Sequence, residues 1–238
     1  MISSCLWRLL VLAAILQYIH RSEANGEEST NSDQEPSSGS TGQPSVQPED
    51  TLPLFLTPYI ERCDYDTAKT KSKVEFFQYM ANVSAYSGLI TVNKTYNSSL
   101  FFLFLVAEGN SSTAPILLWT QGGPGLSSLF GQFLENGPIA FDGKPNVSIR
   151  TNTLQKNMSI IYLDVPIGSG FSFTDVPDGY STSLEDITRD VMEFLKQFFD
   201  LFYEYQNRDF YLAGESYGGL YHDLFFFALL NDSVVHWV

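Results

Sequence analysis

The stretch GESYGG at residues 214–219 decides the fold, because its first five residues fit the G-x-S-x-G pattern of a nucleophile elbow. The preceding residues 209–213 (DFYLA) alternate and are rich in aromatic side chains, which predicts a short buried strand. The apolar residues 220–230 that follow predict a helix. Strand, sharp turn and helix in this order would hold the hydroxyl of Ser216 above a sheet at a strained backbone angle.

Small residues are needed on both sides of this serine. A side chain at Gly214 or Gly218 would collide where the strand and the helix pass each other. The motif is short enough to occur by chance or at an ordinary strand-to-helix turn. It therefore needs support from the rest of the sequence.

A second glycine-rich stretch, WTQGGPG at residues 119–125, follows a continuous apolar run. We expect it at the edge of the sheet where proteins of this class bind ligands. Its glycines would let the backbone approach a substrate and direct N–H groups at one point, as an oxyanion hole requires. Alone it is equally compatible with an ordinary Gly-Pro loop, but upstream of G-x-S-x-G it is interpreted as the second half of the same site.

The apolar pattern predicts an α/β protein, with antiparallel strands first and strand–helix alternation afterwards, as in an α/β-hydrolase core. Residues 93–97 (NKTYN) predict a hairpin turn, and residues 184–205 have the apolar spacing of a helix. Two of the predicted strands are continuous apolar runs, which are typical of central strands covered on both faces. The predicted strands are residues 75–83, 88–92, 100–107, 116–120 and 159–164, the last two being the continuous runs.

Composition divides the chain into three segments. Residues 1–24 resemble a secretory signal, with Arg8, an apolar core too short to span a bilayer, and small residues before a predicted cleavage after Ala24. An N-terminal membrane anchor is the alternative. Residues 25–51 contain one aliphatic side chain and predict a disordered acidic spacer or a propeptide. Residues 52–238 have the composition of one globular domain, so we expect a mature protein without a membrane span.

Charge and cysteine content restrict the possible partners. The formal net charge of −14 argues against a nucleic-acid partner. Of the two cysteines, Cys5 lies in the predicted signal, which leaves Cys63 either as a free buried thiol or with a partner outside this chain. The spacing of potential ligands suggests no metal site, and no cofactor is expected.

Seven N-x-[ST] sequons together with a predicted signal indicate several surface glycans. Asn157 precedes a predicted buried strand and is a doubtful acceptor, as is Asn231. The predicted glycosylation sites are Asn82, Asn93, Asn97, Asn110 and Asn146.

Four motifs, in this order and spacing, resemble the serine carboxypeptidase family, and two further stretches resemble its vitellogenic-like branch. The resemblance covers about residues 52–221 and implies an α/β-hydrolase fold. The four motifs are WTQGGPG (119–125), GQFLENGP (131–138), YLDVPIGSGFSF (162–173) and GESYGG (214–219). The two further stretches are PLFLTPYI (53–60) and GLITVNKTYNSSLFF (88–102).

The resemblance implies a role for several residues. Ser216 would be the nucleophile, and the N–H groups of Tyr217 and Gly123 would form the oxyanion hole. Family members hold the free carboxylate of a peptide C-terminus with one amide and two acidic side chains. Carboxyl groups packed together cannot all ionise, so some pKa values should rise and activity should favour acidic pH. The residues at the substrate-binding positions are Gln121, Glu135 and Glu215, with Trp119 and Gly122 beside them.

The sequence after the elbow departs from the family. In this fold a serine nucleophile relies on an Asp and a His that follow it along the chain. Here only His222 and His236 follow Ser216, and His222 is expected on the far side of the same helix. We therefore expect an incomplete α/β-hydrolase fold, the N-terminal part of the domain, that ends just after the elbow helix.

The expected function is that of a serine-type carboxypeptidase, secreted or lysosomal, which releases C-terminal residues from peptides through an acyl-enzyme on Ser216. In this truncated form it is expected to be weakly active or inactive. Peptide or protein C-termini are the expected partners. A secreted isoform that binds peptides without cleaving them is the alternative. A lipase or esterase is a third possibility, although those enzymes usually carry an HGGG-like segment in place of QGGPG.

Overall fold

The computed structural model describes residues 53–141 and 147–231. The predicted signal segment, the predicted spacer, Asn146 and His236 lie outside these residues. Nearly all described residues belong to one compact unit, which spans Pro53–Ala140 and Ser148–Val238.

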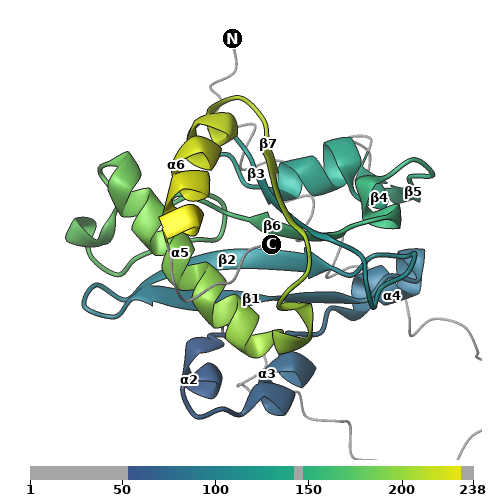
Figure 1. Cartoon of the computed structure of the whole chain (residues 1–238), viewed down its shortest axis with the longest axis horizontal. Helices are drawn as coiled ribbons and strands as arrows, with labels where there is room; N and C mark the ends of the chain where they lie inside the picture. Colours follow the sequence, from purple (N-terminus) through teal and green to yellow (C-terminus); the bar gives the residue numbers. More distant parts are fainter. Residues whose placement is uncertain (1–52, 142–146, 232–238) are drawn as a thin grey trace, which may run out of the picture. The chain divides into compact units, whose positions relative to one another are not determined.

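A mixed five-stranded sheet lies at the centre of this unit, with the strand order β1-β2-β6-β3-β7 (Figure 1). β1, β2 and β6 pair antiparallel, whereas β6, β3 and β7 pair in parallel. This arrangement confirms the predicted α/β class, in which antiparallel strands come first. The strands are β1 (Ala85–Asn93), β2 (Ser98–Leu105), β3 (Ile116–Thr120), β6 (Ser159–Leu163) and β7 (Phe210–Gly214).

The predicted hairpin is confirmed for β1 and β2, whose register pairs Leu89 with Phe101. Its turn is closed by local polar contacts. The backbone N–H of Thr95 donates to Asn93 Oδ1 at 3.0 Å. Asn97 adopts a left-handed φ of 51°, which asparagine tolerates better than most residues. The turn residues therefore suffice to explain the hairpin.

The parallel strands bring the two glycine-rich motifs to the same edge of the sheet. β3 and β6 are almost wholly buried, as their continuous apolar sequences predict. At the carboxyl ends of the neighbouring strands β3 and β7, Thr120 pairs with Gly214. The loop after β3 and the elbow after β7 therefore emerge side by side.

Helix α5 (Leu184–Leu201) packs across β1 and β2 and contributes the aromatic core (Figure 1). It begins with a capping box, in which the side chains and backbone N–H groups of Ser183 and Asp186 bond reciprocally. The ring of Phe198 meets that of Phe104 edge to face, with centroids 5.1 Å apart. The predicted helix ran to residue 205, but Phe202 leaves helical angles and buries its ring against Phe104.

The predicted strand at residues 75–83 is wrong, because the structure forms helix α4 (Glu75–Ala81) there. In a strand Phe77 and Tyr79 would share a face. Instead Phe77 is 3% exposed and Tyr79 is 88% exposed. Asn82 ends the helix in a left-handed conformation, with its N–H bonded to the carbonyls of the last turn. The run of aromatic residues was misleading, because only one of them faces the core.

Cys63 corrects a second expectation. Its side chain is exposed, so the alternative of a free buried thiol is wrong.

The sequence did not predict several short elements. These are α2 (Thr57–Ile60), α3 (Tyr65–Ser72), the π-helix η3 (Gly131–Asn136), the 3₁₀ helices η4 (Leu154–Lys156), η5 (Pro177–Gly179) and η6 (Tyr203–Tyr205), and the two-stranded sheet of β4 (Ile139–Phe141) and β5 (Val147–Ile149).

Helix α6 (Tyr217–Asn231) begins directly after the elbow serine, three residues earlier than predicted. It places Phe225 in the core, whereas Phe226 is 54% exposed.

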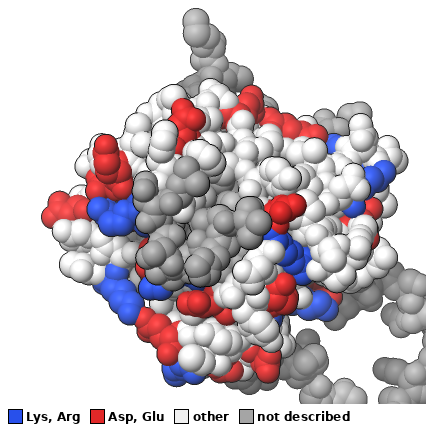
Figure 2. All heavy atoms as spheres, viewed as in Figure 1, with Lys and Arg blue, Asp and Glu red and all other residues white. Residues whose placement is uncertain are grey.

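Among the described residues, none of the helices combines the length and the apolar character that a bilayer crossing needs. On the face drawn in Figure 2, acidic side chains are spread over the surface with basic ones among them.

Candidate active site

Ser216 occupies the turn between β7 and α6, with an exposed side chain. Its φ of 55° lies in the left-handed region, which is uncommon for a residue other than glycine. Such strain persists only where the surrounding structure enforces it. The strand, the sharp turn and the helix therefore form the elbow that the sequence predicts.

The glycines around this serine are set by close approaches of the backbone. A Cβ at Gly218 would lie 2.5 Å from the carbonyl oxygen of Thr120, and one at Gly214 would lie equally close to it. Both distances are far below van der Waals contact. The predicted collision between strand and helix is confirmed at Gly214, where a Cβ would also lie 2.7 Å from His222 on α6. At Gly218 the opposing element is β3 instead.

The loop after β3 packs directly on the elbow. A Cβ at Gly122 would lie 2.9 Å from the Cβ of Ser216 and 3.0 Å from the amide nitrogen of Tyr217. Gly123 follows with a φ of 115°, which favours glycine. The structure thus brings the loop that contains Gly123 next to Ser216 and to the Tyr217 amide.

A chain of hydrogen bonds joins three of the predicted substrate-binding residues. Gln121 Nε2 donates to Glu215 Oε2 at 2.5 Å, and Trp119 Nε1 donates to Gln121 Oε1 at 3.0 Å. Because both ends of the Gln121 amide are engaged, its orientation is fixed. Gln121 is buried and Glu215 is exposed beside Ser216.

Glu135 completes this cluster from the π-helix η3. Burial, followed by a hydrogen bond with Glu215 and the charge of that residue, raises the pKa of Glu135 to about 7. A hydrogen bond from Gln121 and the charge of Arg150 act in the opposite direction. Near neutral pH, Glu135 is therefore partly protonated and can donate a hydrogen bond that an ordinary carboxylate cannot.

Arg150 supports η3, a role that no feature of the sequence indicated. Its guanidinium donates to the carbonyls of Phe133 at 3.1 Å and Gln132 at 3.3 Å, and also to that of Gly137. These carbonyls lie in and just after η3, and that of Gln132 also accepts from the Gly137 N–H at 3.2 Å. Arg150 thereby fixes the turn that carries Glu135.

Asp164 organises the loop after β3 and was also missed, although it lies within the quoted motif YLDVPIGSGFSF. It is buried at the end of β6. Its Oδ1 accepts from Ser127 Oγ at 2.8 Å and from the Ser128 backbone N–H at 2.7 Å, and its Oδ2 accepts from the Phe171 N–H at 2.9 Å. Ser128 Oγ accepts in turn from the Gln121 N–H. The carboxylate thus links the end of β6 to the loop that carries Gln121.

We expect Asp164→Asn to destabilise the protein by about 2 kcal/mol at pH 7.5, because an amide nitrogen would face a backbone donor in a buried site. Burial raises the pKa of Asp164 to about 6, against the hydrogen bonds from Phe171, Ser127 and Ser128. The raised pKa means that the folded state holds the proton more tightly than the unfolded chain, so stability should fall as pH rises from about 4 to 6.

Urea unfolding of the wild type and of Asp164→Asn at pH 4.5 and 7.5 measures both effects. Asp164 should make the free energy of unfolding of the wild type larger at pH 4.5 than at pH 7.5. The variant lacks this carboxyl group, so its free energy of unfolding should lack that contribution to the pH dependence. An unchanged pH dependence in the variant would rule out Asp164 as its source.

His222 is the one histidine in the part of the chain that the structure describes, and its contacts lie on the sheet side of α6. Its Nε2 is 3.0 Å from Thr120 Oγ1, and its ring lies 2.7 Å from where a Cβ of Gly214 would be. Burial lowers the pKa of His222, which favours the neutral ring. The structure therefore pairs this imidazole with Thr120 and assigns it no contact with Ser216.

The predicted glycosylation sites remain predictions, and the structure gives their local setting. Asn82 and Asn110 are exposed, Asn93 is half-buried, and the exposed Asn97 donates from Nδ2 to Asp175 Oδ2 at 2.6 Å. Asn146 lies outside the described residues.

Among the residues that the structure describes, no three acidic, His or Cys side chains are placed to hold a metal ion.

Comparison with known proteins agrees with this geometry. The model of the family described as serine carboxypeptidase matches residues 75–234 of the chain. The chain belongs to the serine carboxypeptidase family. The resemblance stated from the four motifs is thereby confirmed, and the fold is that of an α/β hydrolase.

Relatives in the serine carboxypeptidase family place this chain near the vitellogenic branch. It is 46% identical to the venom serine carboxypeptidase of Apis mellifera over 75% of the chain and 38% of that protein. It is 44% identical to the vitellogenic carboxypeptidase of Aedes aegypti over 76% of the chain and 38% of that protein. The probable serine carboxypeptidase CPVL of Homo sapiens is 45% identical over 78% of the chain and 37% of that protein.

A solved serine carboxypeptidase has the same fold. The prohormone-processing carboxypeptidase Kex1 of Saccharomyces cerevisiae superposes with a TM-score of 0.62 at 26% identity, over 68% of this chain and 39% of that one. The chain thus spans somewhat more than a third of the length of the relatives that it matches.

Proposed function

We propose that this chain carries the nucleophile and the carboxylate-binding half of a serine-type carboxypeptidase site. Ser216 attacks the last peptide carbonyl of a substrate, and the N–H groups of Gly123 and Tyr217 stabilise the charge that develops on its oxygen. The observation that supports this most strongly is that Gly122 packs against an exposed serine with a left-handed φ. Nothing in that geometry is needed for an ordinary turn.

Specificity for a free C-terminus follows from the cluster beside the serine. Glu135, with its pKa raised to about 7, is protonated at acidic pH, and its O–H donates a hydrogen bond to the substrate carboxylate. Gln121 is held in one orientation by Trp119 and Glu215, and a substrate carboxylate would replace one of the two carboxyl groups that its Nε2 contacts. A lipase or esterase would have no use for such a cluster, which favours a peptide substrate.

The 238 residues by themselves are proposed to be weakly active or inactive. Attack by a serine needs a base, and the described His222 bonds Thr120 instead. Binding of peptide C-termini without cleavage is the second candidate function, and it is favoured by the same cluster, which does not depend on a base. Passage through the secretory pathway, to a secreted or lysosomal destination, belongs to this proposal.

Turnover and binding of one ligand separate these functions. Purified full chain should bind an N-blocked dipeptide at pH 5 but release its C-terminal residue at least about 10⁴-fold more slowly than a complete relative such as the Apis enzyme. Ser216→Ala should bind equally well. If the full chain turned over the dipeptide as fast as the relative, the proposal that it is weakly active or inactive would be wrong. If it neither bound nor cleaved the dipeptide, the proposal of a peptide site would be wrong.

A further inference from the structure

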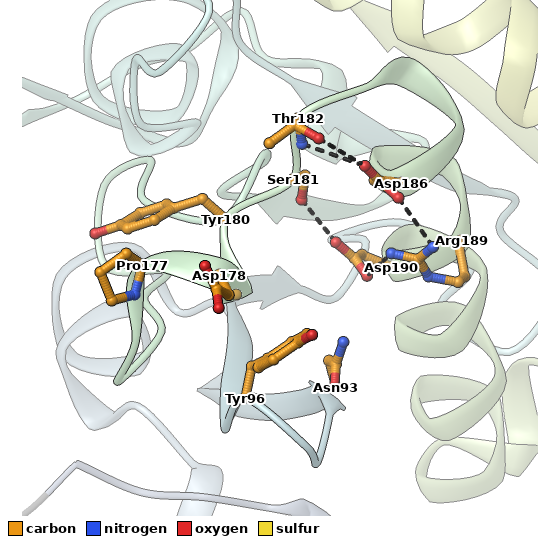
Figure 3. A pocket seen from close by; sticks show the side chains of 11 residues that line it. Asn93, Tyr96, Pro177, Asp178, Tyr180, Ser181, Thr182, Asp186, Arg189 and Asp190 are labelled. Atoms are coloured by element: carbon orange, nitrogen blue, oxygen red, sulfur yellow. Dashed lines mark hydrogen bonds and ion pairs between the residues drawn. The ribbon is translucent and has the colours of Figure 1, made fainter.

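A polar hollow of about 470 Å³ lies away from the candidate active site, in the volume range of about 300–1,000 Å³ that is usual for small-molecule pockets (Figure 3). It is bounded by the β1–β2 turn, by residues 177–182 and by the first turns of α5. None of the residues that line it has a place in the proposed peptide site. Asn93 lines it and begins the sequon Asn93-Lys94-Thr95.

The side chain of Asn93 is oriented with its glycan-acceptor atom toward the hollow. The backbone N–H of Thr95 donates to Asn93 Oδ1 at 3.0 Å. A donor must face the oxygen of an amide, so this bond fixes which way the side chain points. Nδ2 is thereby directed away from the turn, and in Figure 3 it points toward α5, where Asp190 and Arg189 lie.

The lining has the mixed chemistry that a sugar ring presents. Tyr96 is 36% exposed, and in Figure 3 its ring lies beside Asn93, where it offers a flat apolar surface on which the C–H face of a pyranose can pack. Arg189 on α5 pairs with Asp186 at 3.0 Å, but its side chain is 63% exposed, so it keeps N–H donors for hydroxyl and acetamide groups. Asp190 beside it is buried and already accepts from Ser181 Oγ at 2.7 Å. Such a lining matches an uncharged polyhydroxylated ring better than a charged or wholly apolar ligand.

The second sequon in the same hairpin differs in the state of its acceptor nitrogen. Asn97 Nδ2 already donates to Asp175 Oδ2 at 2.6 Å, and a sugar attached there would break this bond. The two residues that follow Asn97 are buried in β2. Asn93 is therefore the acceptor in this hairpin whose sugar has a preformed site in the folded protein.

We propose that an N-linked glycan on Asn93 rests its first N-acetylhexosamine rings in this hollow. The attachment forms a bond from Asn93 Nδ2 to C1 of a lipid-diphosphate-linked oligosaccharide and breaks the C1–O bond to the lipid diphosphate. One Nδ2 proton is released with the diphosphate as leaving group. The sugar then covers Tyr96 and ties the hairpin to the start of α5.

Protection of the sugar linkage tests this directly. The full chain is secreted from eukaryotic cells, and occupancy of Asn93 is measured by glycopeptide mass spectrometry. Removal of the glycan by peptide N-glycosidase is then timed on native and on urea-denatured protein. Release at Asn93 should be roughly tenfold slower in the native protein, equivalent to about 1.4 kcal/mol of contact, whereas release at the exposed Asn110 should differ by less than about threefold.

Variants distant from the sequon show whether the hollow causes the protection. Tyr96→Ala leaves Asn93-Lys94-Thr95 intact and should abolish most of the tenfold difference, as should Arg189→Ala, which supplies an independent test if one variant misfolds. Tyr79→Ala, at an 88% exposed position on α4, is the matched control and should keep the protection. An unoccupied Asn93, equal release rates in native and denatured protein, or protection that survives both pocket variants would overturn the proposal.

Discussion

An N-blocked dipeptide with a free carboxylate should bind this chain about 100-fold more weakly at pH 9 than at pH 5. Below its pKa of about 7, Glu135 carries a proton that it can donate to the ligand carboxylate. Above that pH Glu135 is ionised and must take up a proton from solvent when the ligand binds. The affinity should therefore fall about tenfold for each pH unit. The ligand carboxyl itself titrates at about 3.5, so the tightest binding should lie between these two pKa values.

Substitution of Glu135 separates this cause from a general loss of fold. Glu135→Gln keeps a donor at every pH, so its affinity should vary by less than about threefold between pH 5 and 9. Glu108→Gln, at an exposed position outside the site, should retain the full dependence of the wild type. Isothermal titration at several pH values gives these affinities, and circular dichroism checks the fold.

A dipeptide with a C-terminal amide supplies the ligand control, because it has no carboxylate to accept the proton. It should bind weakly and without this pH dependence. If Glu135→Gln still lost about 100-fold in affinity on going to pH 9, Glu135 would not be the group that titrates.

Gly218→Ala should destabilise the protein by about 3 kcal/mol, whereas Gly219→Ala should be neutral or stabilise it by up to about 1 kcal/mol. A methyl group at Gly218 would lie 2.5 Å from the backbone oxygen of Thr120, in a buried strand that cannot move aside. At Gly219 nothing lies within 4 Å. Alanine there gains only its better helix propensity.

The two variants form a matched pair, because they add the same methyl group to adjacent positions of α6. Urea unfolding followed by circular dichroism measures the difference in the free energy of unfolding, expected to be about 3–4 kcal/mol. Equal stabilities would mean that α6 does not approach β3 as closely as described.

Some elements were predictable because one local pattern determines each of them. The continuous apolar run that forms β3 (Ile116–Thr120) has no polar side that could face solvent, so a central strand is the simple outcome. The start of α5 is fixed by a local capping box at Ser183. Residues 75–83 were misassigned, because several aromatic residues in a row match both a strand and a helix until burial selects one face.

Family motifs pointed to the residues of the candidate site, but not to the residues that support them. The motifs contain Ser216, Gln121, Glu135 and Glu215, so these could be named from the sequence. Arg150 gave no signal, since its function depends on carbonyls at the end of a π-helix that the sequence does not reveal. Asp164 lay inside a quoted motif, but its partners come from two separate loops.

The sequence by itself determined the elbow around Ser216, the five strands of the central sheet and the family, because these depend on residue types at fixed spacing. Only the tertiary structure decided the pKa of Glu135, which depends on burial and on the nearness of Glu215 from another segment. It also decided that Asn93 faces a hollow whereas Asn97 bonds Asp175. Charge, burial and distance between segments far apart in the chain are properties of the folded arrangement, and no local pattern encodes them.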